Sequence, residues 1–286
     1  MIQSMTGFGK ATFQLPTKKI TVEIKSLNSK GLDLNVRMPS VYREMELGLR
    51  TQLSNALERG KIDFAIYIEN TTEQTSTRVN VPIVKAYIAQ LLEIYPNADE
   101  TELMKMAVRM PDALKTERDE VDETEWKQIE GVISDAVNNI KSFRIAEGSA
   151  LEREFLQRIA NIMTMMNATV AMDSERIENV KKRLSAALED LKVTLDENRF
   201  EQELIFYLEK YDITEEKVRL ENHLNYFIQT LADSEANGRK LGFITQEMGR
   251  EINTMGSKSN HAAMQKLVVQ MKDELEKIKE QVLNVL

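Results

Sequence analysis

The sequence predicts an α+β fold, with a small N-terminal β-sheet domain that carries a packed helix and a C-terminal domain built from long helices. In the first 70 residues apolar and polar residues alternate, which is the pattern of strands with one buried face. All five prolines lie at or before Pro111, and neither glycine nor proline occurs between Gly148 and Gly238. Both residues interrupt helices, so their absence predicts long helices there. We place the boundary near residue 150, which gives domains 1–150 and 151–286.

The N-terminal elements are expected in the order βββαβ. A first strand lies in MIQSMTGFGKATF, where the glycines are expected to let the strand bend or pack closely. The next three strands are marked by alternating apolar residues: Ile20, Val22 and Ile24; Leu32, Leu34, Val36 and Met38; Ile62, Phe64, Ile66 and Ile68. An amphipathic helix precedes the last of them, with Met45, Leu49, Leu53 and Leu57 on one face. Pro39-Ser40 suits its start and Gly60 its C-cap. A short strand near TRVNV and a helix that opens at Pro82 follow.

From Trp126 onward the pattern is helical. Apolar residues form three stripes at spacings of three and four: Leu151, Phe155, Ile159, Ile162, Met166 and Val170; Ile177, Val180, Leu184, Leu188 and Leu191; Met264, Leu267, Met271, Leu275, Ile278, Val282 and Val285. The last stripe is a near-heptad seam that must be buried within the chain or between subunits. We expect part of the helical surface to close a homo-oligomer.

Composition narrows the class of protein. The chain has no cysteine, which excludes a disulfide framework, a thiolate nucleophile and a cysteine-based zinc site. No apolar run approaches the roughly 18 residues that a membrane span requires, and the first residues do not read as a secretory signal. We therefore expect a soluble cytoplasmic protein with no membrane partner.

Charge is distributed unevenly. The net charge is −8, yet residues 1–70 carry ten Lys and Arg against seven Asp and Glu, and residues 236–272 carry six against two. An acidic surface with two basic segments can direct a polyanion to one face. The alternative is that these charges only solvate helix surfaces.

Familiar catalytic motifs are missing. GFGKAT lacks the glycine spacing of a phosphate-binding loop, there is no G-x-S-x-G elbow, and neither His223 nor His261 has a histidine four residues away. Two helical stretches remain as candidates for a functional site. Thr214 is expected to cap the first, which carries Arg219 and His223 on a polar face.

The second stretch carries Glu247 and Glu251 on one side of a helix, next to a buried stripe. Like charges at this spacing repel unless a cation lies between them. One interpretation is an ion pair with Arg250 or Lys240. The other is a divalent cation, which prefers carboxylate oxygens, with His223 as a further ligand or proton shuttle.

The sequence resembles the YicC/YloC family. SMTGFGKA, EIKSLNSKGLDLNVRMP and LERGKID are similar to its N-terminal half, and GRKLGFITQEMGREINTMGSKSN followed by KIKEQVLNV is similar to its C-terminal signature. The resemblance runs over the whole chain and is weakest around residues 95–200. It implies a bacterial cytoplasmic endoribonuclease that depends on a divalent metal, manganese with magnesium as the alternative. It also implies a homohexameric clamp that admits RNA, and other RNA-decay proteins are further candidate partners.

Carried over by position, the resemblance assigns catalytic and metal-binding roles to Glu247, Glu251 and His223. The sequence departs from the family at Gly242, commonly Asp, at Gly249, commonly Asn, and at His261, often Asp or Asn. If the aspartate were a metal ligand, Gly242 would weaken the site here. The residues expected to bind RNA phosphates are basic: Arg239, Lys240, Arg250, Lys258, Lys30, Arg37, Arg43 and Arg59.

Three functions are compatible with these features. A metal held by the two glutamates can generate hydroxide and stabilise charge on phosphate oxygens, which gives an endoribonuclease that cleaves single-stranded or structured RNA. The same basic segments without catalysis give an RNA-binding clamp that presents RNA to another nuclease. The C-terminal seam alone supports a structural helical oligomer.

Overall fold

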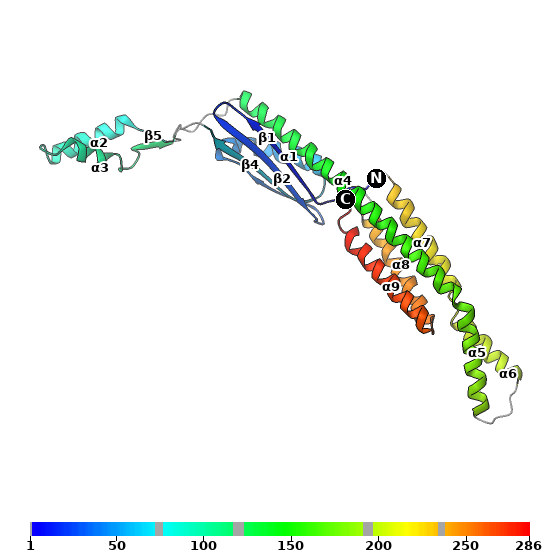
Figure 1. Cartoon of the computed structure of the whole chain (residues 1–286). Helices are drawn as coiled ribbons and strands as arrows, with labels where there is room; N and C mark the ends of the chain where they lie inside the picture. Colours follow the sequence, from blue (N-terminus) through cyan, green and yellow to red (C-terminus); the bar gives the residue numbers. More distant parts are fainter. Residues whose placement is uncertain (1, 72–76, 117–122, 191–196, 234–237) are drawn as a thin grey trace.

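The computed structural model describes residues 2–71, 77–116, 123–190, 197–233 and 238–286, arranged as an elongated chain (Figure 1). A four-stranded sheet lies in its middle, a small α/β unit lies beyond one end of the sheet, and a bundle of long helices lies beyond the other. The predicted α+β class, with a sheet domain followed by long helices, is confirmed.

The sheet is formed by β1 (Gly7–Gln14), β2 (Lys18–Leu27), β3 (Leu32–Arg37) and β4 (Gly60–Asn70) in the order β1-β2-β4-β3. Only β3 and β4 run parallel, and the 3-10 turn η1 (Ser40–Met45) with α1 (Glu46–Leu57) connects them. This is the predicted βββαβ order. The expected cap is wrong in one detail, because α1 ends at Leu57 and Glu58 leaves the helix with φ of 52°. Gly60, with φ of 122°, begins β4 instead.

One face of the sheet is buried under α1 and α4 (Glu123–Ala171). The alternating apolar residues of β2 and β4 point to this face, for example Ile24, which is paired with Phe64 in the register. Strand β1 lies so close to α4 that a Cβ atom added at Gly9 would come within 2.2 Å of the Ala136 carbonyl oxygen. The predicted close packing of these glycines is therefore confirmed, and any larger residue at position 9 would displace α4.

A separate small unit contains β5 (Thr77–Val79), α2 (Val81–Ile94), α3 (Glu100–Ala107) and β6 (Leu114–Thr116). The expected strand near TRVNV and the helix opening at Pro82 correspond to β5 and α2. The unit has its own small core of Val84, Ala107 and Ala113.

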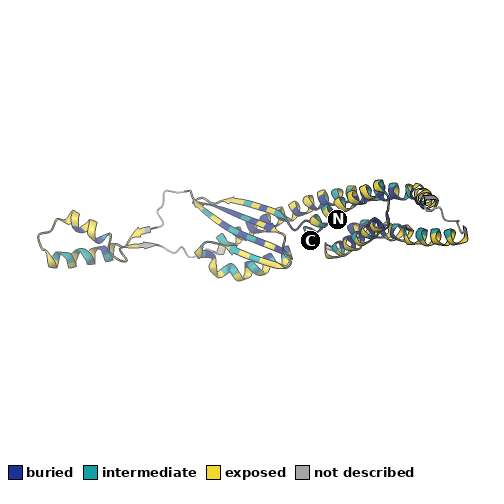
Figure 2. Cartoon of the chain, turned by 90° about the horizontal axis from the view of Figure 1, so that it is seen from below, coloured by how far each residue is buried: buried dark blue, intermediate teal, exposed yellow. Residues whose placement is uncertain are grey.

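Helix α4 is 49 residues long and belongs to both halves of the chain. At the rise of an α-helix it spans about 74 Å. Its first part packs on the sheet through Ile133 and Ile140, and its second part enters the helical bundle through Phe155 and Ile159 (Figure 2). The expected domain boundary at residue 150 thus lies inside a continuous helix.

The bundle consists of the second part of α4 with α7 (Thr214–Ala232), α8 (Gly238–Lys258) and α9 (Ala262–Val282). The C-terminal seam is buried inside it, since Met264, Met271, Leu275 and Ile278 are at most 1% exposed. Because the chain itself covers this seam, the seam no longer argues for an oligomer. Oligomerisation remains a prediction.

Helices α5 (Asp173–Asp190) and α6 (Glu197–Lys210) extend beyond the far end of the bundle (Figure 1). Of the stripe expected on α5, Val180 is buried. The side chains of Leu184 and Leu188, and the whole of Leu191, lie outside the described residues.

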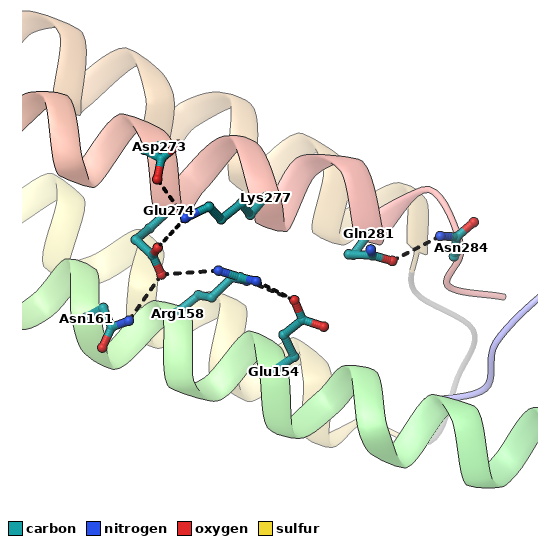
Figure 3. A network of polar contacts seen from close by, with 8 residues as sticks. All are labelled: Glu154, Arg158, Asn161, Asp273, Glu274, Lys277, Gln281 and Asn284. Atoms are coloured by element: carbon teal, nitrogen blue, oxygen red, sulfur yellow. Dashed lines mark hydrogen bonds and ion pairs between the residues drawn. The ribbon is translucent and has the colours of Figure 1, made fainter.

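A polar network joins α4 to α9 on the surface of the bundle (Figure 3). Arg158 donates to Glu154 on its own helix and contacts Glu274 of α9 at 3.4 Å, while Lys277 donates to Glu274 at 2.9 Å. The hydrogen bond from Lys277 lowers the pKa of Glu274, with help from Asn161 and Arg158 against a smaller opposing effect of burial. The network therefore favours a charged Glu274 and fixes the lengthwise position of α9 on α4.

The two ends of the chain meet where the sheet joins the bundle. The Met5 amide donates to the Asn284 carbonyl at 2.7 Å, and the Leu286 amide donates to the Gln3 carbonyl at 2.9 Å. This short pairing holds the C-terminal segment against the start of β1. No helix in the described ranges is long and apolar enough to cross a membrane.

Candidate functional site

Helices α7 and α8 pack side by side and run antiparallel (Figure 1). Three side-chain contacts define their register. Glu216 contacts Lys258 at 2.7 Å, Arg219 contacts Glu251 at 3.9 Å, and the Nζ of Lys240 lies 5.0 Å from the ring centre of Tyr226. Along these contacts the residue number rises on α7 as it falls on α8.

The two predicted acidic residues have different surroundings. The Glu251 side chain is only 7% exposed and faces Arg219 of α7. Glu247 lies one turn earlier, is half exposed, and has Arg250 at 3.9 Å. Both ion pairs are long, so neither glutamate is held in a close hydrogen-bonded salt bridge of the kind that stabilises a fold.

The ion-pair interpretation from the sequence needs correction at two points. Lys240 does not pair with either glutamate, since it lies 3.7 Å from Asp233 and over the Tyr226 ring. The cation nearest Glu251 is Arg219, which also pairs with Glu215. Sequence spacing could not reveal this partner, because it comes from a different helix.

His223 lies one turn after Arg219 on α7 and is half-buried. Since Arg219 faces Glu251 and the helices are antiparallel, His223 lies level with Glu247, one turn back on α8. Two carboxylates and an imidazole have the donor chemistry of a Mn²⁺ or Mg²⁺ site. However, no three acidic or histidine side chains in the part of the chain that is described lie close enough together to hold a metal. A metal here would need further oxygen ligands from water or phosphate.

Lys258, expected to bind phosphate, is already engaged. It donates to Glu216, whose side chain is 7% exposed and whose second carboxylate oxygen has no partner among the described residues. Nearby, the buried Arg176 donates to the carbonyls of Tyr211 and Lys258. Lys258 therefore helps to hold the far end of the bundle together.

A groove of about 650 Å³ lies where the sheet meets α8 and α9. It brings together three predicted RNA-binding residues, Lys30, Arg59 and Arg239, although they are distant in the sequence. Lys279 of α9 joins them and was not predicted. The rest of the lining is apolar or uncharged: Met5, Asn28, Gly238, Gly242, Thr245, Gln246, Val282, Leu283 and Val285.

A buried arginine holds in place the segments that line this groove. Arg144 of α4 is 2% exposed and donates to the carbonyls of Met5 and Arg59, two lining residues, and to that of Leu57. It also donates to the Ser26 hydroxyl. Burial lowers the pKa of Arg144 while Glu58 acts in the opposite direction. One side chain thus fixes the ends of several segments that meet at the groove.

The groove and the acidic pair lie on different sides of α8. Gly242, in the groove, precedes Glu251 by nine residues, which is about two and a half helical turns. The two positions therefore point in opposite directions. An aspartate at position 242 could not join Glu251 in one metal site of the same chain, so Gly242 does not weaken such a site.

Arg37 and Arg43 are not part of the groove lining. Arg37 lies on the open face of the sheet, in a shallow hollow with Glu23, Lys25 and Asp63. Many charges on that face neutralise each other, as in the 2.9 Å contact between Lys10 and Glu23, which lowers the pKa of Glu23. Arg43 is exposed on η1.

Thr214 is not the cap of α7. It is the first helical residue, and the Asp212 carboxylate accepts hydrogen bonds from its hydroxyl at 2.6 Å and from its amide at 2.9 Å. These two bonds are the main reason that the pKa of Asp212 is lowered.

Comparison with known families covers nearly the whole chain. The family model described as "Endoribonuclease YicC-like, N-terminal region" matches residues 2–153, and the family model described as "Endoribonuclease YicC-like, C-terminal" matches residues 168–286. The chain belongs to the YicC-like family. The resemblance inferred from the sequence is therefore confirmed.

Two relatives from the family align over their full length and that of this chain. "Probable endoribonuclease YicC" of Clostridioides difficile strain 630 is 32% identical over 293 residues, and the protein of the same name from Haemophilus influenzae strain Rd is 30% identical over 288 residues. The groove takes its lining from both family regions, whereas the acidic pair and His223 belong to the C-terminal region alone.

Proposed function

We propose that this chain is a divalent-metal-dependent endoribonuclease that cleaves RNA within a homo-oligomeric clamp, a hexamer by family resemblance. Manganese is the proposed metal, with magnesium as the alternative. The observation that carries the proposal is Glu251, a carboxylate whose side chain is only 7% exposed and whose cationic neighbour, Arg219, is 3.9 Å away. Burying a charge with so weak a partner is costly, which is expected where the carboxylate serves a ligand.

The names of the two full-length relatives support the reaction class. In this proposal, Glu247 and Glu251 would bind the metal ion, and oxygens of the RNA would be further ligands. When bound, such a metal polarises a phosphate and activates water. His223, on the facing helix, moves a proton during cleavage. Arg219 and Arg250, which lie beside the glutamates, attract the phosphate to be cleaved.

A non-catalytic clamp that presents RNA to another nuclease is the competing proposal. It requires basic residues but gives no reason for a buried glutamate on α8. A purely structural oligomer is less well supported than either, because the seam that suggested it is covered inside the chain.

The test uses a 5′-labelled RNA with purified protein in Mn²⁺, Mg²⁺ or EDTA. We expect cleavage in Mn²⁺ that EDTA abolishes, and a loss of at least 100-fold in Glu247→Gln and in Glu251→Gln. The matched control is Glu221→Gln, because Glu221 is exposed on α7, and it should cleave like wild type. Cleavage by both variants at the wild-type rate would refute the metal site, and RNA binding without cleavage by the wild type would favour the clamp.

The assembly is tested separately. Light scattering at micromolar concentration should return a multiple of the 32.8 kDa chain mass. A monomer would refute the clamp as proposed.

A further inference from the structure

We infer that the groove between the sheet, α8 and α9 binds the sugar–phosphate backbone of a single RNA strand, at a site separate from the acidic pair. The inference rests on the proposed function, since the ligand is the RNA substrate, and it names which form of RNA the chain binds and where.

The charge of the groove points to a polyanion. Lys30, Arg59, Arg239 and Lys279 come from four different segments, and none of the residues that line the groove is acidic. Arg59 donates to the Ser29 carbonyl, and Lys279 pairs with Glu276, which lies outside the lining. Lys30 and Arg239 are exposed. Positive charges gathered in a hollow without counter-charges in its walls concentrate anions there.

The size and lining of the groove favour a single strand over a duplex. Its volume of about 650 Å³ is within the range of sites that enclose one small ligand. Part of the lining is apolar, and Leu283 in it is 64% exposed, so it can accept a ribose or an unstacked base. The amides of Asn28 and Gln246 can bond to base edges. In an RNA duplex the bases are stacked and paired, and they cannot contact such an apolar lining.

The position of the groove gives it a role distinct from cleavage. Because the groove and Glu251 lie on opposite sides of α8, a strand held in the groove leaves the acidic pair free. A strand that reached both on one chain would have to pass around the helix, about 10 Å across. Loss of groove contacts should therefore raise KM much more than it lowers kcat.

The first experiment removes charge from the groove rim. In Lys30→Gln/Lys279→Gln, binding of a fluorescent oligouridine is measured by anisotropy in EDTA, across a salt series. The matched control is Lys61→Gln/Lys272→Gln, which removes two exposed lysines from the same two parts of the chain. The slope of log K against log salt should flatten by about 1.4 in the groove variant, with affinity at least about tenfold weaker near 0.1 M salt. The control should keep the wild-type slope.

The second experiment fills the groove. A Cβ at Gly242 would meet only Val282, at 3.9 Å, so side chains are tolerated there. Gly242→Glu should weaken oligouridine binding at least tenfold, while Gly242→Ala should not.

The outcomes separate this inference from the proposed function. If Lys30→Gln/Lys279→Gln and Gly242→Glu both bind oligouridine as wild type does, the claim that the groove binds RNA is refuted, whether or not the protein cleaves RNA. A wild type that binds RNA through the groove but never cleaves it overturns only the nuclease. Equal binding of a duplex of the same length, equally lost in the variants, refutes the preference for a single strand. A wild type that binds no RNA refutes both.

Discussion

Lys258 gives the clearest test of whether a cation predicted to bind phosphate serves RNA or the fold. Replacing it with methionine removes the 2.7 Å bond to Glu216 and leaves a carboxylate that is 7% exposed with neither oxygen paired. Breaking a buried ion pair from one side costs about 3–5 kcal/mol. Lys258 itself is 27% exposed, which lets water soften the loss, so we expect the free energy of unfolding to fall by about 2–3 kcal/mol.

Urea unfolding of Lys258→Met, Glu216→Gln and the double variant measures this as a double-mutant cycle. The double variant should be more stable than Lys258→Met, because the uncompensated charge is gone, with a coupling energy of about 1–3 kcal/mol. If Lys258→Met costs less than about 0.5 kcal/mol and the two changes are additive, the pair contributes nothing. Lys258 would then be free to bind phosphate, as the sequence predicts.

Three further predictions concern the fold that supports the site. Arg144→Met should lower the free energy of unfolding by about 3–4 kcal/mol, since four acceptors, three of them in buried bonds, lose a charged donor; a loss under about 1 kcal/mol in urea unfolding would contradict its role at the groove. Glu274 has a lowered pKa in the folded state, so its charged form stabilises the fold above its ordinary pKa of 4.5, and this stabilisation is lost as the pH falls through the lowered pKa. Glu274→Gln should therefore lose less stability than wild type between about pH 6 and 3.5. If the free energies of unfolding of the two proteins fall in parallel over this pH range, the prediction is refuted. Asp212→Ala should cost about 1 kcal/mol through loss of its two hydrogen bonds to Thr214 at the start of α7, whereas Asp233→Ala, at the other end of that helix, should cost less.

Local sequence patterns predicted most of the fold, because strand alternation and helical stripes are properties of neighbouring residues. Ile20 to Ile24 and Ile62 to Ile68 alternate as strands do, and these runs lie in β2 and β4. Pattern could not place α4 across both halves of the chain, since a stretch without glycine or proline has no mark where one core ends and another begins. It also misplaced the end of α1, where Glu58 is the C-cap, and the start of α7, where the N-cap is Ile213 and Asp212 binds the first helical residue.

The candidate site was predicted less completely, because it depends on contacts between distant segments. The spacing of Glu247 and Glu251 placed them on one side of a helix, but only the packing of α7 makes one buried and the other half exposed. The buried Arg144 gives no signal in the sequence, because an arginine in a polar helix usually reads as exposed. Likewise, nothing near Lys30 indicates that Lys279 lies across a groove from it.

The central claim is that Glu247 and Glu251 together hold the metal that RNA cleavage requires. Its most direct test is to measure the binding of Mn²⁺ in the presence of an RNA that resists cleavage. The electron paramagnetic resonance signal of the free ion reports how much Mn²⁺ remains unbound. Wild type and Glu221→Gln should each bind Mn²⁺ in proportion to the chain concentration, and Glu247→Gln/Glu251→Gln should bind it at least 100-fold more weakly. Equal binding by the double variant would contradict the account, because the metal would then be held elsewhere.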